Sequence, residues 1–498
     1  MRTLTLSMIV KNEAHRLGEC LQSAKEIADE IVIVDTGSTD ETVNVAESYG
    51  AKVFFFKWMK DFAAARNFAL RKSTSDLILY LDADEKLTSK SVKEIYRIKQ
   101  KREVAGYNCK VTSIESEFGR DNSMLYVRLF SNSDSIEFSG KVHEQISPSL
   151  VANNYKIIDT NIEIIHTGYD ISLDAKKEKA RRNLELLLNE YSVNKSAYYA
   201  YQLGLTYQII EEEKESAKYF ELALSDKKLS KNFRARCYSS LAIYDLKNHN
   251  VSLAEKNIQD ALKENNEDAF THLVASKIYL RKQDLTLSKQ HLEKAIRQNN
   301  KSKSEKTKSE SIVVLDDYEI YSHSVALAKA MNDKNYLISS GQKLIDSVKN
   351  SEVANTLTKV FKNTSLNDLE TQNLLRNVDK RRFEIVLLFL NDYNIIESKT
   401  VLLKALSTKF PESIELKSIL AKHYTSINDN NAAIQLYEEL KNSKSDPSIY
   451  FYLISLYISE GNLLEVKNLV SEIETNFSNI PEVSSRVVIL KEKLQKYL

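Results

Sequence analysis

Four alternations of a short, apolar, β-prone run with a helix-prone stretch open the chain, and this pattern restricts the folds available to it. The predicted strands cover residues 3–10, 30–34, 51–56 and 77–81. The predicted helices cover residues 14–28, 61–72 and a segment that begins at a capping-box motif, S-x-x-E at 38–41, and closes at Gly50. Strands that alternate with helices form a parallel sheet with crossover helices. We therefore predict a Rossmann-like α/β domain.

Polar loops follow three of these predicted strands. They cover residues 11–13, 35–38 and 82–84. In open α/β sheets, ligands bind outside the carboxyl ends of the strands, where all three loops would lie. We expect one crevice to collect them.

The pattern changes after about residue 105. Shorter β-prone runs, such as 123–130 and 161–166, predict antiparallel strands that complete the domain. After Tyr169 the sequence turns helical and remains so. A hydrophilic break at residues 299–311 interrupts the helices, and we predict a mobile loop there.

Length and composition indicate a folded chain with more than one domain. The chain has 498 residues, whereas one hydrophobic core usually serves roughly 250 to 300. A net charge of +1 gives no electrostatic reason to expect nucleic acid as the main partner. No apolar stretch is long enough for a membrane span and the opening does not read as a secretory signal, so we expect a cytoplasmic location. The three cysteines form no CxxC pair and suggest neither disulfides nor a thiolate zinc site.

The helical part contains internal repeats. Small residues recur in pairs at a fixed spacing: Gly204 with Ser216, Ala242 with Ala254, and Ser276 with Ser288. The step from Ala242 to Ser276 equals the tetratricopeptide period of about 34 residues. A further copy contains Ala421 and Ala433. We predict degenerate tetratricopeptide repeats, which stack into a solenoid that commonly binds a peptide or a subunit; a plain helical bundle is the alternative.

The predicted organisation has four segments. They are an α/β domain at 1–172, a helical linker with repeats at 173–300, a flexible polar loop at 301–312, and helical repeats at 313–498. We expect the last segment to support a homodimer or to bind the molecule on which the protein acts.

The acidic turn Asp82-Ala83-Asp84 carries the expected chemistry. Glycosyl transfer from a nucleoside diphosphate sugar builds negative charge on the departing diphosphate, and a divalent cation held by carboxylates stabilises that charge. Two aspartates can converge on one ion where the chain leaves the strand geometry. Hard cations such as Mg²⁺ and Mn²⁺ prefer such oxygen ligands. Acidic pairs at strand ends are also common as turn or cap residues, so the two neighbouring polar loops are what favour the metal site.

Four successive segments carry a family resemblance. They read SMIVKNEAHRLGECLQS, EIVIVDTGSTDET, DFAAARNFAL and LYLDADE, and together they resemble the motifs of family 2 glycosyltransferases of the GT-A fold over roughly residues 1–170. The segments GKVHEQ and HTGYD, with repeats behind them, are similar to the sublancin S-glycosyltransferase branch, which modifies a cysteine of a bacteriocin peptide. Cell-surface and lipopolysaccharide-core transferases share these segments. The QxxRW motif of processive membrane synthases is absent.

The resemblance implies roles for individual residues. It places Asn12 and Glu13 near the uridine, Asp35 on the base or ribose, and Arg66 opposite the diphosphate. The full nucleotide-sugar set is Val10, Asn12, Glu13, Asp35, Gly37, Ser38, Lys57, Arg66, Asn67, Asp82 and Ala83. The alternative is that Asp35 and Ser38 cap the next helix and that Arg66 pairs with Asp61 or Asp40.

The metal and acid–base residues complete the predicted site. The resemblance of the HTGY segment adds His166 to Asp82 and Asp84 as a third metal ligand, although a lone histidine is often an ordinary side chain. Attack by an acceptor hydroxyl needs a general base, commonly a carboxylate, whereas a cysteine thiol with a pKa of about 8.5 needs less help. Glu144, next to His143, is the candidate base. Asp84 and Glu85 are its competitors.

We therefore predict an inverting, metal-dependent transferase that uses Mg²⁺ or Mn²⁺. Its donor would be a UDP-sugar, with UDP-glucose or UDP-GlcNAc favoured, and its acceptor a Cys, Ser or Thr of a peptide or protein. One alternative changes the acceptor to a cell-envelope or lipopolysaccharide-type glycan. A second alternative is a peptide-binding repeat scaffold with an inactive transferase domain.

Overall fold

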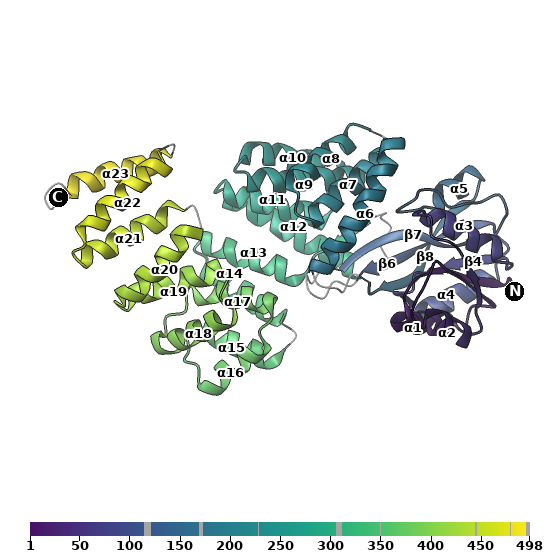
Figure 1. Ribbon diagram of the computed structural model, residues 1–498, viewed down its shortest axis with the longest axis horizontal. Coiled ribbons are helices and arrows are strands. Elements are labelled where there is room, and N and C mark those ends of the chain that lie inside the picture. The colour runs from purple at the N-terminus through teal and green to yellow at the C-terminus, as the bar shows by residue number, and fades with distance from the viewer. Residues whose placement is uncertain are drawn as a thin grey trace. The chain divides into compact units, whose positions relative to one another are not determined.

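A computed structural model describes residues 1–113, 121–168, 173–227, 229–304, 311–348, 350–443, 446–478 and 480–494. The chain divides into two compact units, Met1–Leu337 and Ile338–Leu498 (Figure 1). The first unit contains a mixed sheet, the helices around it, and the first set of helical hairpins. The second unit is helical. The predicted succession of an α/β domain and an all-α repeat region is confirmed.

The four predicted β-α alternations form the parallel half of the sheet. Its strands are β1 (Leu4–Val10), β2 (Glu30–Asp35), β3 (Lys52–Phe55) and β4 (Leu77–Tyr80). They lie in the order β3-β2-β1-β4. The central strand β1 is apolar along most of its length because both of its faces are covered, and Leu4, Leu6 and Met8 have no exposed surface.

The other half of the sheet is largely antiparallel, as the shorter β-prone runs predict. Its strands are β5 (Glu85–Leu87), β6 (Ala105–Ser113), β7 (Asp121–Ser131) and β8 (Lys156–His166). β7 joins the two halves because it pairs with β4 on one side and β6 on the other. The sequence did not indicate β5, a three-residue strand that pairs with the end of β8.

Five helices accompany the sheet. They are α1 (Ala14–Ala24), α2 (Thr42–Ser48), α3 (Phe62–Lys72), α4 (Ser89–Lys99) and α5 (Ser147–Ala152). Asp61 caps α3 by accepting a hydrogen bond from the Ala64 backbone at 2.8 Å, which explains why the predicted start of this helix holds.

The predicted capping box at residues 38–41 is wrong. Helix α2 begins only at Thr42, and the side chain of its N-cap residue, Glu41, makes no capping hydrogen bond. The Ser38 hydroxyl instead accepts a hydrogen bond from the Asn12 backbone at 2.9 Å. A contact between two loops has replaced the local contact that the motif predicted.

Helical hairpins follow the sheet domain in the first unit. Their helices are α6 (Leu173–Val193), α7 (Ala197–Ile209), α8 (Glu213–Leu224), α9 (Lys231–Lys247), α10 (Val251–Glu264), α11 (Ala269–Arg281), α12 (Leu285–Ser304) and α13 (Asp317–Ala330). The paired small residues lie where the helices of a hairpin approach. The Ser216 hydroxyl donates to the Gly204 carbonyl at 2.9 Å, and the Ser276 hydroxyl donates to the Ser288 carbonyl at 2.7 Å.

The predicted flexible loop at 301–312 is wrong for its two ends, and residues 305–310 lie outside the described residues. Residues 301–304 continue α12, and Ser311 begins strand β9 (Ser311–Val314), which pairs with β7. Nearby, the fully buried side chain of Asn299 donates to the Leu315 carbonyl at 2.9 Å and accepts from the Leu315 amide at 2.7 Å. The hydrophilic composition predicted a solvated loop here. Strand pairing between β9 and β7 instead connects the helical region to the sheet.

The second unit continues the helical pattern. Its helices are α14 (Lys334–Asp346, which begins in the first unit), α15 (Ser351–Phe361), α16 (Asp368–Asn377), α17 (Lys380–Leu390), α18 (Ile396–Lys409), α19 (Ile414–Ser426), α20 (Asn430–Ser443), α21 (Pro447–Ser459), α22 (Leu463–Asn476) and α23 (Pro481–Leu494). Ala421 and Ala433, the predicted small pair, are fully buried between α19 and α20. Among the described residues, no helix combines the length and apolar character needed to cross a membrane.

Candidate active site

The acidic turn lies between β4 and β5 and is fixed by its own backbone. The Glu85 amide donates to the Asp82 carbonyl at 3.0 Å, and the Asp82 amide donates to the Glu85 carboxylate at 3.0 Å. The side chain of Ala83 packs into the core of the sheet domain. Partial burial, followed by the charge of Asp84, raises the pKa of Glu13. Arg16, at the start of α1, has its Nη1 atom 3.9 Å from Asp84 Oδ2, and β1 runs parallel to β4. The acidic turn therefore lies beside the segment that follows β1, as the parallel topology predicts.

Asp84 and His166 lie side by side at the ends of adjacent strands. The His166 Nε2 atom is 3.2 Å from Asp84 Oδ2, and β5 pairs with β8 so that Glu85 lies opposite His166. Partial burial would lower the pKa of His166, but the hydrogen bond and charge of Asp84 outweigh it and raise that pKa. A metal ligand must be unprotonated, so cation binding here would release a proton at low pH.

Gly168 allows the backbone to pass close to this pair. A Cβ atom added at Gly168 would lie 1.7 Å from Asp84 Oδ2 and 2.9 Å from His166 Nε2. No side chain can occupy that space unless the pair moves. The carboxylate and imidazole therefore pack directly against bare backbone.

Arg66, at 6% exposure, bridges two carboxylates. Its Nη2 donates to Asp82 Oδ1 at 2.6 Å, and its Nε donates to Glu144 Oε1. The alternative partners are not used, since Asp61 caps α3 and Asp40 accepts from the Thr42 amide. Partial burial disfavours the charged form of Asp82, but the guanidinium groups of Arg66 and Arg128 hold its pKa well below the ordinary value.

Arg128 is a site residue that the sequence reasoning missed. Its Nη2 lies 2.6 Å from Glu85 Oε1 and 3.7 Å from Asp82 Oδ2. Its guanidinium also stacks over the Tyr80 ring at 4.6 Å, where Arg66 lies at 4.9 Å. The one available signal was a single arginine within the apolar run MLYVRLF of β7, because an arginine in a buried strand needs a carboxylate partner.

The predicted metal ligands are only partly assembled. Within the described ranges, no group of three His, Cys, Asp or Glu side chains is arranged to hold a metal ion. Asp84 and His166 are adjacent, whereas Asp82 is directed to Arg66 and lies with its side chain 36% exposed. The donor chemistry of these three groups, two carboxylates and one imidazole, suits a divalent cation.

The first two polar loops are joined by hydrogen bonds. The Asn12 side chain accepts from the Thr39 amide at 2.7 Å, and the Glu13 amide donates to the Thr42 hydroxyl at 2.8 Å. The Val10 carbonyl accepts from the Thr36 amide at 3.0 Å. Asn12 and Gly37 both adopt the left-handed conformation, with φ of 55° and 111°. Together these contacts give the two loops one defined shape.

Asp35 holds a buried oxygen without a partner. Its Oδ1 accepts from the amides of Gly37 and Ser38, each at 2.9 Å, so that it stabilises the turn and does not cap α2. Its Oδ2 is buried and accepts no hydrogen bond within the described part of the chain. A buried carboxylate oxygen is costly unless it accepts a hydrogen bond, and a ligand N–H or O–H would supply one.

Three further predicted residues occupy different surroundings. Lys57 is exposed beyond β3. Asn67 uses its side-chain amide to donate to the Phe138 carbonyl at 2.9 Å and to accept from the Phe138 amide at 2.7 Å, so it holds backbone. His143 is exposed and has a φ of 53°. Their predicted contacts with a nucleotide sugar or acceptor stay predictions.

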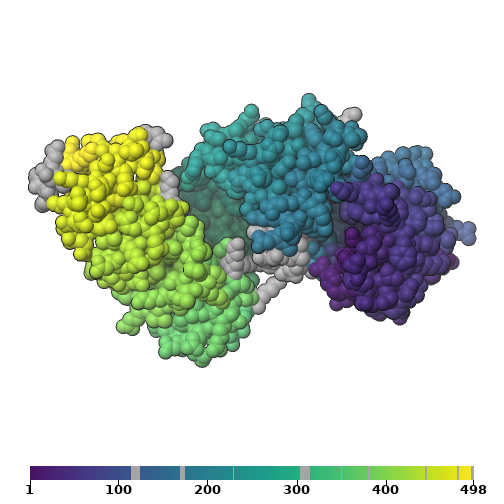
Figure 2. All heavy atoms as spheres, in the orientation of Figure 1, coloured from purple at the N-terminus to yellow at the C-terminus, as the bar shows by residue number. Residues whose placement is uncertain are grey.

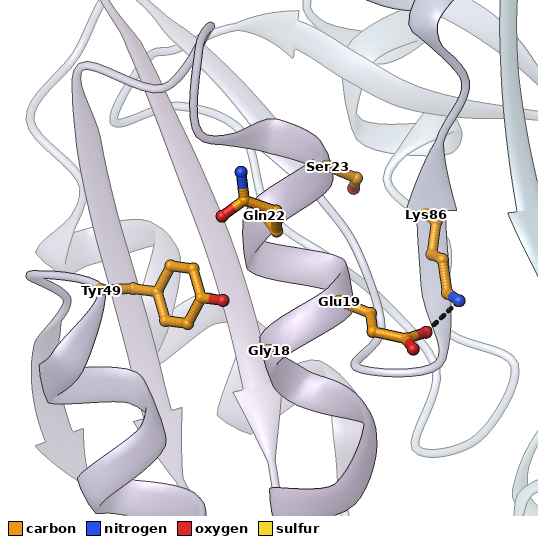
Figure 3. A pocket seen from close by; sticks show the side chains of 6 residues that line it. All are labelled: Gly18, Glu19, Gln22, Ser23, Tyr49 and Lys86. Carbon is orange, nitrogen blue, oxygen red and sulfur yellow. Dashed lines mark hydrogen bonds and ion pairs between the residues drawn. The ribbon is translucent and has the colours of Figure 1, made fainter.

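A separate surface hollow lies on the outer side of α1 (Figure 3). Its lining residues are Gly18, Glu19, Gln22, Ser23, Tyr49 and Lys86, and Glu19 forms an ion pair with Lys86 across it. None of the predicted site residues lines this hollow.

Comparison with known proteins identifies the first domain. Residues 5–150 match the family model described as Glycosyl transferase family 2. A TPR repeat-containing protein of Synechococcus elongatus is 34% identical over 213 residues, which cover 41% of this chain and 52% of that protein. The SPbeta prophage-derived glycosyltransferase SunS of Bacillus subtilis is 27% identical over 229 residues, which cover 45% of this chain and 54% of that protein.

The similarity to the curated relatives covers only part of each protein. The chain spans about half the length of the curated relatives that it matches. A solved tetratricopeptide repeat protein from Parabacteroides merdae aligns over 59% of this chain and 98% of its own length, with 8% identity and a TM-score of 0.40. The chain therefore carries a glycosyl transferase family 2 domain at its start, with tetratricopeptide-like helical hairpins behind it.

Proposed function

We propose that this protein transfers a hexose from a UDP-sugar to a Cys, Ser or Thr side chain of a peptide or protein, with inversion at the anomeric carbon. One observation carries the proposal. In a domain that matches family 2, β4 runs parallel to β1, and Arg16, just after the first polar loop, lies 3.9 Å from Asp84 of the acidic turn, which supports a common site for donor binding and charge stabilisation.

Asp35 supports a nucleotide donor. Its unpartnered Oδ2 is buried beside two backbone amides that already fix its other oxygen. This arrangement suits an N–H of a planar base, because the rigid acceptor is placed before the ligand arrives. The uracil of a UDP-sugar presents such a donor.

Asp82, Asp84 and His166 are the residues that would hold a divalent cation. When bound, Mg²⁺ or Mn²⁺ neutralises the charge that develops on a departing diphosphate. The protein contributes Arg66 and Arg128, whose guanidinium groups set the ionised state of Asp82 and limit its position. These contacts keep the first carboxylate of the turn charged at neutral pH.

Glu144 is the proposed general base. Its side chain lies at the same buried arginine as Asp82, so the base and the acidic turn are held by one group. The carboxylate would accept the proton of the attacking acceptor group as the new glycosidic bond forms and the bond to the diphosphate breaks. The other candidates for this role lie in different surroundings from Glu144. Glu85 is fully buried against Arg128, and Asp84 is paired with His166. His143 is exposed.

The repeats support a peptide or protein acceptor. Helical hairpins of the tetratricopeptide type present a concave surface that commonly binds extended peptides. The resemblance of the GKVHEQ and HTGY segments to the peptide S-glycosyltransferase branch points in the same direction. Exposed apolar side chains on α22 and α23, Leu464, Val488 and Ile489, support self-association of the chain as a homodimer.

A donor screen tests the proposal. The full chain is incubated with Mn²⁺ and UDP-glucose, UDP-GlcNAc or UDP-galactose, and UDP release is measured with and without a mixture of unstructured peptides containing Cys, Ser or Thr. We expect one donor to be preferred, and Asp84→Ala to lower its turnover by at least about a hundredfold. The exposed Asp134→Ala variant serves as the control. Unchanged turnover and metal dependence in Asp84→Ala would contradict the assignment.

A further inference from the structure

The loop that carries Glu144, residues 139–145, is a closed structure, named here the Glu144 loop. Its base is shut by two backbone hydrogen bonds between Ser139 and Gln145, of 3.0 Å and 2.9 Å. Gly140 and His143 have φ of 96° and 53°, and these two left-handed residues allow the chain to reverse over so short a length. The position of the whole loop therefore decides where Glu144 lies.

The tip of the Glu144 loop belongs to an apolar cluster of the repeat region. Val142 is 3% exposed and belongs to an apolar cluster formed mainly by α6, α7 and the helices behind them. Leu187 of α6 and Ala197 and Tyr201 of α7 are members of this cluster. The sheet domain contributes Phe62, at the start of α3. The apolar contacts of Val142 are thus supplied largely from outside the transferase fold.

A polar contact fixes the loop beside its tip. One oxygen of Glu190, Oε2, accepts from the Lys141 amide at 3.3 Å and from the Tyr199 hydroxyl at 3.2 Å. Burial, and then the charge of Glu190, raise the pKa of Tyr199 to about 12, so its hydroxyl is protonated and donates at neutral pH. A Cβ atom added at Gly140 would lie 2.8 Å from this hydroxyl, which shows how closely the loop backbone passes.

The opposite side of the loop is bound to the sheet domain. The Phe62 amide donates to the Lys141 carbonyl at 2.9 Å, and Arg66 of the same helix α3 binds Glu144. Lys141 therefore uses its carbonyl toward α3 and its amide toward Glu190 of α6. The Glu144 loop is held between the transferase domain and the hairpin of α6 and α7, which lies at the sheet-domain end of the helices in the first unit (Figures 1 and 2).

We propose that the α6–α7 hairpin is part of the catalytic apparatus: Glu190 and Tyr199 are positioning residues that, with the apolar socket for Val142, set the place of Glu144 relative to Arg66 and the acidic turn. This proposal rests on the proposed function, because it gives Glu144 its catalytic meaning. It assigns the first hairpin a role other than acceptor recruitment.

The test uses the full chain with Tyr199→Phe and Glu190→Ala. Two readouts are taken: amide hydrogen exchange over residues 139–145, and kcat and KM for hydrolysis of the UDP-sugar that the wild type turns over best. We expect faster exchange in both variants and a fall in kcat of about tenfold to a hundredfold, because small misplacements of a catalytic group cost that much. KM for the donor should change less than about twofold, because the residues whose contacts the variants remove, Glu190, Tyr199 and Lys141, are not among the predicted donor-binding residues.

Tyr207→Phe is the matched control, since Tyr207 lies on the same helix and stacks on Tyr219 at 5.4 Å. It should alter neither readout. Unchanged exchange over 139–145 in Glu190→Ala overturns the proposal whatever the activity, and so does faster exchange with wild-type kcat. A wild-type chain that hydrolyses no UDP-sugar contradicts the proposed function instead. The exchange data then show separately whether Glu190 and Tyr199 hold the Glu144 loop in place.

Discussion

His166 Nε2 lies 3.2 Å from Asp84 Oδ2, although α4, β6, β7 and α5 separate the two residues in the sequence. The short ladder between β5 and β8 sets this distance, because it places Glu85 directly opposite His166. The Thr167 amide adds a hydrogen bond of 2.9 Å to the Asp84 carbonyl. The second aspartate of the acidic turn and the histidine are therefore held in place by backbone, and not only by their own attraction.

Gly168→Ala should disturb this pair selectively. The new Cβ would fall 1.7 Å from Asp84 Oδ2, so the carboxylate must rotate away from His166. We expect Mn²⁺-dependent UDP-sugar hydrolysis to drop by about a hundredfold or more. Gly18→Ala is the control, since its nearest neighbour would be 3.6 Å away, an ordinary contact. Equal activity of the two variants would show that the Asp84–His166 pair is not needed.

Asp35→Asn should weaken nucleotide binding while the fold persists. The amide keeps an acceptor at Oδ1 for Gly37 and Ser38 but can present a donor in place of the unpartnered Oδ2. Loss of one hydrogen bond to a charged acceptor costs about 1.5 to 3 kcal/mol, which corresponds to a roughly 10- to 100-fold higher Kd for UDP. Isothermal titration calorimetry measures it, and a Kd within twofold of the wild type would refute the role of Asp35.

Glu30 should make stability depend on pH in the acid range. Burial opposes its ionisation, but hydrogen bonds from Lys52, Thr5 and Thr74 lower its pKa from 4.5 to about 2. Because the folded pKa is below the unfolded one, the stabilisation is complete above about pH 4.5 and is lost as the pH falls through about 2. Glu30→Gln should therefore lower Tm at pH 7, and the difference from wild type should shrink below pH 4.5. The exposed Glu47→Gln should show no such trend.

Arg128→Met should destabilise the first unit strongly. Glu85 is fully buried, and its pKa is raised by burial even with Arg128 beside it, so removal of the guanidinium leaves an unpaired buried carboxyl. Breaking a buried ion pair on one side costs about 3 to 5 kcal/mol in the free energy of unfolding. Adding Glu85→Gln should restore part of that loss, as urea unfolding can measure. If the single variant is as stable as wild type, the pair has no structural role.

Asn299→Ala should loosen the junction between α12 and β9. The amide makes two hydrogen bonds with the Leu315 backbone, and truncation leaves a buried N–H and a buried C=O without them. Each unsatisfied group costs about 1 to 3 kcal/mol. We expect a lower Tm and faster hydrogen exchange at Leu315, whereas the exposed Asn300→Ala should behave as wild type. Wild-type exchange at Leu315 would show that the two hydrogen bonds of the Asn299 side chain do not stabilise this junction.

Local pattern was sufficient for much of the fold. Hydrophobic period and strand-end polarity predicted β1 to β4, α3, and the small-residue pairs of the helical hairpins. The predicted capping box at Ser38 is wrong because the Ser38 hydroxyl accepts a hydrogen bond from the Asn12 amide, which is distant in the sequence. The loop predicted from the hydrophilic composition is wrong at residues 311–312, because these residues pair with β7 as part of a strand.

By itself, the sequence determined the α/β alternation, the polar loops at the carboxyl ends of the strands and the helical repeats, because each depends on residues within a few positions of one another. Only the tertiary structure decided that Arg66 joins Asp82 to Glu144, that Arg128 supports the acidic turn, and that α6 and α7 hold the Glu144 loop. Partners of buried charges and the surroundings of a loop tip depend on which distant elements meet, and this is fixed by the packing of the whole unit.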